Sequence, residues 1–283
     1  MQAFLGMGLL GSNFVKAMLK RGEQVQVWNR TASKAKALEA EGAKAFNKAA
    51  EAVKGADMIH LTLKEDRSVN EVLDGAQSGF KPGVMIIDHT TTSVEGAIER
   101  TALWNAKGFT YLHAPVFMGP KNALESTGVM LVSGDQQVIK KVTSELSKMT
   151  GKLVNLGPEE GKATGMKLIG NLFLMALTSG LSDTLSLAKS FDFSAEDVMA
   201  LFEFWDPAKI APARLKRMSE GNFKQPSWEL NMARKDAGLM MQAAKQKKSP
   251  LIVIPAIAEA MDQKIKEGYG NYDWTVIAKD SIE

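Results

Sequence analysis

Lys167 and Asn171 are the side chains of this sequence best placed for acid–base chemistry on a small polar molecule. A helix turns about 100° per residue, so positions four apart share one face, and an ammonium and a carboxamide there can reach the same ligand. Taken alone, Lys167 is better explained as a solvated lysine on an ordinary helix. The rest of the chain must decide between these interpretations.

A glycine-rich segment, Gly-Met-Gly-Leu-Leu-Gly at residues 6–11, follows a predicted strand at 3–5 and precedes a predicted helix at 9–20. This context predicts a dinucleotide-binding turn, in which the first glycine permits the tight turn, the second admits the pyrophosphate, and the third allows helix–strand packing. A purely structural turn is the alternative. The residues expected at the cofactor are Gly6, Met7, Gly8, Leu9, Leu10 and Gly11.

The end of the second predicted strand indicates which dinucleotide binds. NAD sites usually place an acidic residue there for the ribose hydroxyls, whereas this chain has Asn29. Arg30, Thr31 and Lys34 supply donors and positive charge, which suits the 2′-phosphate of NADP, although Arg30 and Lys34 are also typical of a solvated helix start. Thr62 and Leu63, at the end of a later strand, are also expected to line the cofactor site.

Short apolar runs alternate with helical patterns in the first half of the chain, which predicts an α/β fold with a Rossmann-type, doubly wound parallel sheet. Strands are expected at residues 3–5, 24–28, 58–62, 84–88, 109–112 and 129–132, and helices at 9–20 and 32–41. Helices alone are expected later, at residues 161–189, 194–204, 207–218, 228–245, 250–267 and 274–280. We therefore expect a dinucleotide-binding domain at 1–158 and an all-α substrate and oligomerisation domain at 159–283, with a long interdomain helix.

The composition limits the possible functions. With 283 residues, 45% of them hydrophobic, the chain can bury one or two cores, and a net charge of +3 with scattered basic residues gives no reason to expect nucleic acid as a partner. The absence of cysteine excludes thiolate chemistry, and the three histidines lack metal-ligand spacing. The longest apolar run, residues 168–177, is too short and polar for a membrane span and is expected in a buried helix. We expect a soluble, cytoplasmic protein without a signal peptide or a metal.

Besides the glycine-rich turn, four segments in order resemble the β-hydroxyacid dehydrogenase family, which includes 3-hydroxyisobutyrate dehydrogenases and the tartronate, glyoxylate and succinic semialdehyde reductases. Residues 88–91, Asp-His-Thr-Thr, are similar to the family's Asp-x-Ser-Thr substrate segment, and residues 108–116 resemble its second substrate segment. Residues 161–171 are similar to its Gly-x-Gly-x-x-x-Lys-x-x-x-Asn catalytic helix. Residues 235–239 resemble the Lys-Asp segment near the nicotinamide.

The resemblance assigns roles to individual residues. It implies that Lys167 is the acid–base group of a hydride transfer, with a pKa lowered in a partly desolvated cleft, and that Asn171 positions Lys167 or the substrate. The hydroxyls of Thr90 and Thr91 would donate hydrogen bonds to a substrate carboxylate. Strand capping is an alternative role for these threonines. Lys235 would reach the cofactor.

Departures from the family pattern concern the substrate. Phe117, Met118 and Gly119 stand where the family usually has Ser-Gly-Gly, so a predicted substrate-binding segment is bulky and apolar. His113 stands where the family often has Asp, and Ala163 replaces a glycine of the catalytic segment. These departures disfavour a simple hydroxy acid such as 3-hydroxyisobutyrate as the substrate.

The resemblance favours an NADP-dependent oxidoreductase that interconverts a small aldehyde, semialdehyde or keto acid and the hydroxy acid. An imine reductase is the alternative: residues 28–31 look much like those enzymes, and the apolar Phe117 suits a substrate without a carboxylate, but such enzymes typically replace Lys167. A non-catalytic NADP-binding scaffold, like the chromatin-associated relatives that lose the lysine, is less favoured. The apolar helix at 161–189, with Leu168, Leu172, Met175 and Leu177, predicts a homodimer or homotetramer.

Overall fold

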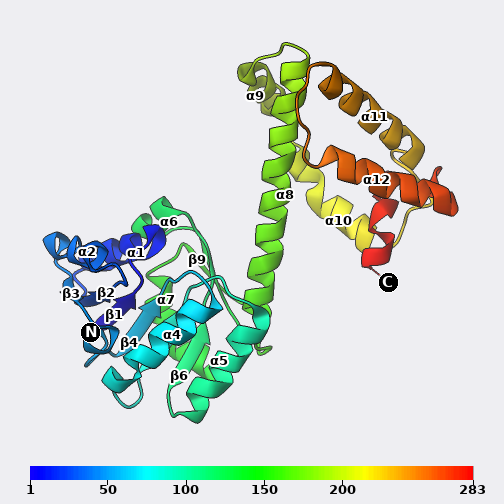
Figure 1. Ribbon diagram of the computed structural model, residues 1–283. Coiled ribbons are helices and arrows are strands. Elements are labelled where there is room, and N and C mark those ends of the chain that lie inside the picture. Colours follow the sequence, from blue (N-terminus) through cyan, green and yellow to red (C-terminus); the bar gives the residue numbers. More distant parts are fainter. Residues whose placement is uncertain (283) are drawn as a thin grey trace. The chain divides into compact units, whose positions relative to one another are not determined.

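The computed structural model describes residues 1–282 and divides into two units, Met1–Asn171 and Leu172–Glu283. The division falls within the longest helix, α8 (Lys162–Ser190), which is continuous in Figure 1. The domain boundary expected after residue 158 precedes this helix. It stays a prediction about where independently folding parts meet.

Six parallel strands form the sheet of the first unit, in the order β3-β2-β1-β4-β5-β6 (Figure 1). They are β1 (Gln2–Leu5), β2 (Val25–Trp28), β3 (Lys44–Phe46), β4 (Met58–Leu61), β5 (Met85–Asp88) and β6 (Thr110–His113). Leu61 pairs with Leu5 on one side and with Asp88 on the other, and Asp88 pairs with His113. The segments that follow these strands therefore meet at one carboxyl edge, where open α/β sheets bind ligands. The predicted doubly wound sheet is confirmed.

Helices cover both faces of this sheet. They are α1 (Leu9–Lys20), α2 (Ala32–Lys36), α3 (Ala49–Ala52), α4 (Asp66–Ala76), α5 (Val94–Ala106), α6 (Pro120–Glu125) and α7 (Gln136–Ser147). Neighbouring residues of β1 face opposite cores: Phe4 packs with Phe14 and Met18 of α1, whereas Leu5 belongs to the core that contains Leu73 of α4. Successive strand side chains point to opposite faces, so a strand buried on both sides has no polar alternation.

A second, three-stranded sheet corrects one expectation. Its strands are β7 (Val116–Phe117), β8 (Val129–Val132) and β9 (Lys152–Asn155), with β7 antiparallel and β9 parallel to β8. The expectation that residues 129–132 extend the main sheet is wrong, because β8 pairs with β7 and β9 instead. The strands β3, β7 and β9 were not predicted, since two- to four-residue strands with polar members give no clear apolar pattern.

The second unit is helical, as expected. Besides the rest of α8 it contains α9 (Ala195–Phe204), α10 (Ala211–Ser219), α11 (Leu230–Gln246), α12 (Ile254–Lys264), a π-helix (Ile265–Tyr269) and 3-10 helices at Pro207–Ile210 and Trp274–Ser281. Its core includes Phe223, Leu230, Met261 and Val276. The helix expected from residue 250 begins later, at Ile254, with Pro255 in its first turn.

Two further helix boundaries differ from expectation. The helix expected at 32–41 is broken into α2 and a 3-10 helix, Glu39–Glu41, which ends at Gly42 with φ of 101°. The helix expected at 207–218 is likewise divided into a 3-10 turn and α10. Pattern alone does not distinguish a continuous helix from two short ones.

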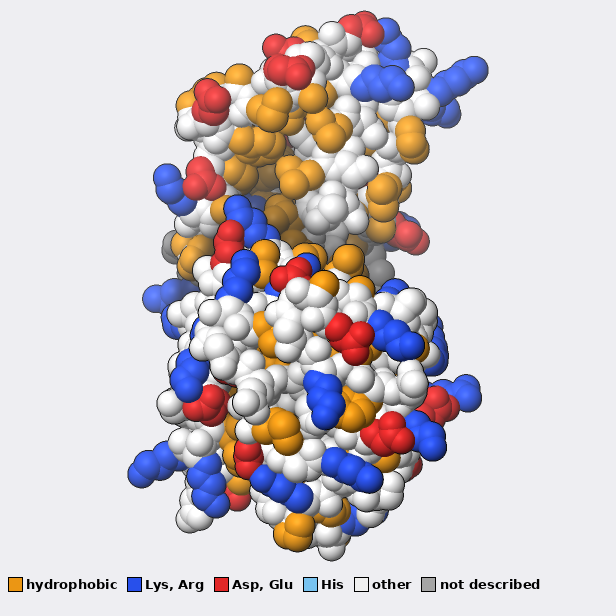
Figure 2. Space-filling model, turned by 90° about the vertical axis from the view of Figure 1, so that its left-hand side faces the viewer, with side chains coloured by type: hydrophobic (Ala, Val, Ile, Leu, Met, Phe, Trp, Pro, Cys, Tyr) orange, Lys and Arg blue, Asp and Glu red, His pale blue; other side chains and the backbone are white. Residues whose placement is uncertain are grey.

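The middle of α8 is exposed in the single chain, so the expectation of a buried helix is wrong at this level. Leu172 is 70% exposed, Met175 68% and Phe173 61%. Figure 2 shows hydrophobic side chains gathered on a face of the second unit. Within residues 1–282, α8 is also the one helix whose length and composition would allow it to cross a membrane. Length and composition are weak grounds for a span, and what covers this surface is a question of assembly.

Candidate active site

Two positions of the glycine-rich turn between β1 and α1 accept only glycine. Gly6 has φ of 105°, and a Cβ atom there would lie 2.2 Å from the carbonyl oxygen of Thr62. A Cβ atom on Gly11 would lie 2.0 Å from the Gly6 oxygen. Around Gly8, by contrast, nothing lies within 4 Å of a Cβ position. The turn is therefore packed against the end of β4 and open at Gly8.

The helix α1 starts at this open position. Gly8 is its N-cap without a side-chain cap, and the first turn, from Leu9, contains no acidic residue. The first amides of a helix lack partners within the helix, and its N-terminus carries partial positive charge. Met7 is different, because its side chain lies in the core and its amide donates to Oδ1 of Asn29 at 2.9 Å. The free amides around Leu9 and Leu10 fit a pyrophosphate group.

A pocket of about 330 Å³ lies beside this helix end. From the predicted cofactor residues it is lined by Gly6, Gly8, Asn29, Arg30, Thr31, Lys34, Thr62 and Leu63. The pocket is also lined by five residues that were not predicted at the cofactor, Trp28, Lys64, Ser68, Glu71 and Val72. Their signal was available, because they lie at the end of β2 or in the segment after β4, at the same carboxyl edge as the glycine-rich turn.

Unpaired basic side chains give this pocket its charge. Arg30 and Lys34 are exposed, and neither forms an ion pair with a carboxylate of residues 1–282. Glu71 also lines the pocket, but its carboxylate accepts from Arg67 at 2.7 Å. Both ends of the Asn29 side-chain amide bind backbone groups. Its Oδ1 accepts from the amide of Met7, and its Nδ2 donates to the oxygen of Thr31 at 3.0 Å. The pocket thus offers cations to an anionic group and has no free carboxylate beside Asn29.

The predicted substrate threonines differ in their surroundings. Thr90 is buried: its amide donates to Asp88 at 2.8 Å, and its hydroxyl accepts from the amide of Leu63 at 2.9 Å. Thr91 is exposed. Thr62 donates its hydroxyl to the Gly6 oxygen at 2.9 Å. The buried threonines therefore tie the loops after β1, β4 and β5 together, and Thr91 is the one whose side chain is open to solvent.

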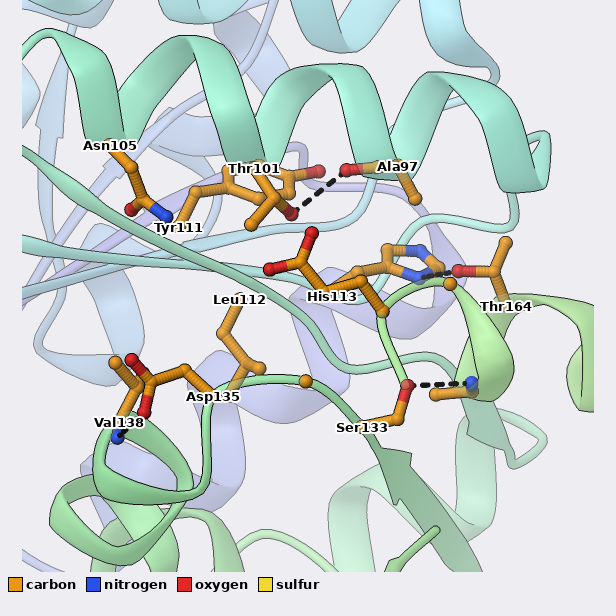
Figure 3. Close-up of a pocket in the computed structure, with 14 residues that line it drawn as sticks. Ala97, Thr101, Asn105, Tyr111, Leu112, His113, Ser133, Asp135, Val138 and Thr164 are labelled. Atoms are coloured by element: carbon orange, nitrogen blue, oxygen red, sulfur yellow. Dashed lines mark hydrogen bonds between the residues drawn. The ribbon is translucent and has the colours of Figure 1, made fainter. Parts of the chain in front are cut away.

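His113, at the end of β6, connects the substrate segment with the start of α8. Its Nε2 lies 2.7 Å from the oxygen of Thr90, and its Nδ1 lies 2.6 Å from the hydroxyl of Thr164. Since Nε2 must donate to the carbonyl, Nδ1 accepts from Thr164, and burial lowers the pKa of His113 so that the ring stays neutral. Figure 3 shows this pair beside a cavity of about 30 Å³, which has room for one water and not for a substrate.

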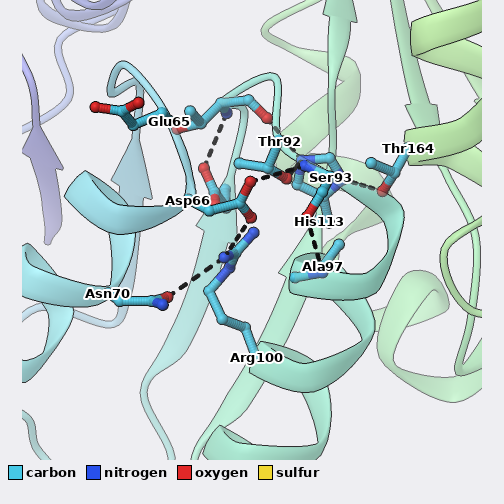
Figure 4. A network of polar contacts seen from close by, with 12 residues as sticks. Glu65, Asp66, Asn70, Thr92, Ser93, Ala97, Arg100, His113 and Thr164 are labelled. Atoms are coloured by element: carbon cyan, nitrogen blue, oxygen red, sulfur yellow. Dashed lines mark hydrogen bonds and ion pairs between the residues drawn. The ribbon is translucent and has the colours of Figure 1, made fainter.

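A buried carboxylate, Asp88, is stabilised by a chain of polar contacts behind the substrate segment. It accepts from the hydroxyl of Tyr111 at 2.7 Å, and Nε of Arg100 donates to that same oxygen of Tyr111 at 3.0 Å. Arg100 also pairs with Asp66 at 2.8 Å, and Asp66 accepts from the amide of Ser93 (Figure 4). The chain places a buried guanidinium within reach of the buried carboxylate through Tyr111, while Asp88 also accepts from the Thr90 amide.

Lys167 lies on the second turn of α8 and is 9% exposed. Its Nζ donates to Oδ1 of Asn171 at 2.9 Å, and it lies 4.4 Å from the ring centroid of Phe117. Within residues 1–282 no carboxylate pairs with it. Burial lowers the pKa of Lys167. The predicted pair thus exists in the geometry that helical spacing implies, with the ammonium shielded from water and not neutralised.

Of the apolar substitutions, Phe117 alone contacts Lys167. Met118 packs against the core of the first unit, beside Gly128. The amide of Gly119 donates to Asn122 at 2.9 Å at the start of α6. Met118 and Gly119 therefore shape the loop, and Phe117 faces the lysine.

Lys235 lies on α11 in the second unit, where its Nζ is 3.1 Å from Asp236. Its predicted contact with the cofactor stays a prediction. No group of three or more acidic or histidine side chains within residues 1–282 is arranged to hold a metal ion.

A parallel sheet in this strand order, with a glycine-rich turn at the first helix, defines a dinucleotide-binding protein. Residues 2–157 match the family described as the NAD binding domain of 6-phosphogluconate dehydrogenase, which is more than half of the chain. The chain belongs to this family.

Relatives and a solved structure extend the likeness beyond that domain. The chain is 24% identical over 280 residues to the uncharacterized oxidoreductase YfjR of Bacillus subtilis. The aligned region covers 98% of this chain and 98% of that protein. It is 26% identical over 280 residues to 3-sulfolactaldehyde reductase of Escherichia coli, covering 97% of this chain and 93% of that protein. An imine reductase from Myxococcus stipitatus in complex with NADP+ has the same fold, with a TM-score of 0.90, 19% identity and 99% of each chain covered. The resemblance to β-hydroxyacid dehydrogenases is confirmed, and the protein is an NAD(P)-dependent oxidoreductase.

Proposed function

We propose that the protein is an NADP-dependent reductase of a small aldehyde, semialdehyde or keto acid, with Lys167 as the proton donor. The observation that carries the proposal is the buried Lys167–Asn171 pair, 2.9 Å apart, in a chain whose first unit is an NAD(P)-binding domain. A non-catalytic scaffold would have no need for a desolvated lysine without a carboxylate partner.

When bound, the nicotinamide cofactor supplies the hydride to the carbonyl carbon. The carbonyl oxygen then gains negative charge and must receive a proton. Lys167 has three N–H donors, of which Asn171 engages one, so another can point to the substrate oxygen. Burial lowers the pKa of the ammonium, which makes proton transfer to the developing alkoxide easier. The neutral amine regains its proton from solvent, and the hydroxyl product leaves.

The pocket supports NADP as the cofactor. Arg30 and Lys34 are free cations at its wall, and Asn29 stands where a carboxylate would repel a 2′-phosphate. The amides at the start of α1 fit the pyrophosphate, and Gly8 leaves room for it.

An aldehyde substrate is supported by the Escherichia coli relative, which is named for reducing 3-sulfolactaldehyde. An imine substrate is the second candidate, because Phe117 places an aromatic ring at the lysine where a carboxylate anchor is usual in the family. Lys167 favours the carbonyl substrate, since an imine nitrogen that is already protonated needs no proton donor.

The test is a panel of aldehydes, keto acids and cyclic imines, each assayed for oxidation of NADPH and of NADH. We expect turnover of a carboxylated aldehyde with NADPH preferred. Lys167→Ala should lower kcat by about a hundredfold or more, with NADPH affinity, measured by calorimetry, unchanged. If only imines turn over, and still do so in the Lys167 variant, the proposal is wrong.

We also propose that a second copy of the chain covers the apolar surface of α8. Between Leu168 and Leu185 the one charged residue, Asp183, is buried within its own chain, so the exposed surface is uncharged. A homodimer or homotetramer buries such a surface, and light scattering after size-exclusion chromatography measures it. A monomer at micromolar concentration would contradict this assembly. The predicted cytoplasmic location stays a prediction.

A further inference from the structure

The ring of Phe117 contacts two positions of α8, the amine of Lys167 and the backbone at Gly170. Its centroid is 4.4 Å from Nζ of Lys167. A Cβ atom on Gly170 would lie 2.3 Å from Cζ of Phe117, so the ring tip rests directly on the bare Cα of that glycine. Glycine inside a helix costs about 1 kcal/mol relative to alanine. Any larger residue at position 170 would collide with the ring, so the contact requires glycine there despite this cost.

The surroundings of Lys167 offer few other ways to stabilise a cation. Burial disfavours the ammonium, and within residues 1–282 no carboxylate pairs with it. Asn171 accepts one hydrogen bond. The remaining compensation comes from the negative face of an aromatic ring, which attracts a cation more strongly when water is excluded.

We propose that Phe117 is the positioning residue of Lys167: its ring, seated on Gly170, keeps the amine protonated and directs its free N–H away from α8. This inference rests on the proposed role of Lys167 as proton donor. It also explains why a bulky aromatic residue stands in a segment where the related family usually carries serine. An ammonium held by an amide oxygen and a ring presents one remaining N–H to the substrate, whereas a lysine without the ring would lose its proton at lower pH.

Two substitutions disturb this contact from opposite sides. Phe117→Leu removes the ring and keeps much of the volume. Gly170→Ala leaves both partners intact but adds the methyl group that collides with the ring, and it raises helix propensity, so loss of folding is not expected from the helix itself. Gly165→Ala is the matched control, because its Cβ would meet only Val94, at an ordinary 3.7 Å.

The pKa of Lys167 can be read without turnover, from the pH dependence of its acetylation by limiting acetic anhydride, measured by mass spectrometry of its peptide. We expect Phe117→Leu and Gly170→Ala to lower this pKa by about 0.5 to 1.5 units, and Gly165→Ala to leave it near that of the unchanged protein. In the enzyme assay, the alkaline limb of kcat should shift to lower pH by the same amount, with the KM for NADPH unchanged.

Equal pKa values in the Phe117→Leu variant and the unchanged protein would overturn the inference, and so would a Gly170→Ala variant whose pKa equals that of the Gly165→Ala control. These outcomes differ from failure of the proposed function. In that case Lys167→Ala would keep its activity, while acetylation would still report whether the ring holds the cation.

Discussion

The side-chain oxygen of Asn29 accepts a hydrogen bond of 2.9 Å from the backbone amide of Met7. The residue after β2 therefore braces the glycine-rich turn after β1. Asn29 therefore has two roles, because its position influences the choice between NAD and NADP and its side chain also holds the glycine-rich turn.

Asn29→Ala should weaken NADPH and NADH together, by about fivefold each, because a hydrogen bond worth about 1 kcal/mol no longer holds the turn. Asn29→Asp is the sharper test, since a carboxylate can still accept from Met7. It should weaken NADPH by about tenfold through repulsion of the 2′-phosphate and leave NADH nearly unchanged. Dissociation constants for both cofactors measure this, and an Ala variant that binds both cofactors as tightly as the unchanged protein would refute the bracing role.

Arg30→Ala should raise the KM for NADPH by about tenfold or more and change that for NADH less than twofold, because a charge-assisted hydrogen bond to the 2′-phosphate contributes about 1.5 to 3 kcal/mol. Lys16→Ala, which removes a lysine paired with Glu41 at 3.1 Å outside the pocket, is the control. The NADPH preference should also fall as salt is added. Equal changes for both cofactors would remove the reason for assigning NADP.

Acid should destabilise the fold through its three buried histidines, His60, His89 and His113. Nδ1 of His60, in β4, lies 3.0 Å from Nε2 of His89, which follows β5. Nδ1 of His89 lies 2.8 Å from the backbone oxygen of Ala114. Burial lowers the pKa of all three rings, that of His89 to about 4. Above the unfolded pKa of about 6.5 both states are neutral and stability is complete. Below it the unfolded chain binds protons that the native rings exclude, so the free energy of unfolding falls as the pH drops from about 6.5 towards 4.

The expected slope is about 1.4 kcal/mol per pH unit for each such histidine. Urea unfolding at a series of pH values between 7.5 and 4.5 measures it. His89→Asn keeps a donor for Ala114 and should flatten the curve by one proton. A free energy of unfolding that does not change between pH 6.5 and 5 would show that these rings titrate normally.

Asp183 should be a main support of the second unit. From α8 it accepts the amides of Ile252, Val253 and Ile254 at 2.5, 2.9 and 3.1 Å, where α12 begins. Asp183→Ala should lower the free energy of unfolding by about 2 kcal/mol or more and speed hydrogen exchange in α12, because buried amides lose a charged acceptor. Ser182→Ala, at an exposed neighbouring position, should change stability by less than about 0.5 kcal/mol. Unchanged exchange in α12 would contradict this support.

The sequence by itself determined the features that depend on local spacing. The alternation of apolar runs and helical patterns predicted the parallel sheet and the helical second part, and the order of glycines after β1 predicted the dinucleotide turn. Helical geometry brought Lys167 to Asn171, because side chains four positions apart on a helix lie on the same face. The short strands β3, β7 and β9 escaped prediction because they depend on pairing partners distant in sequence.

Tertiary structure decided which predicted residues face the site. The hydrogen bonds and packing of Thr90, Met118 and Gly119 are directed to the loops and the core, and their expected place at the substrate stays a prediction. The contact of Phe117 with Lys167 and Gly170 joins segments about fifty residues apart, and neither propensity nor periodicity carries information about such a distance. The same holds for the pKa of Lys167, which depends on how much water the folded chain excludes around it.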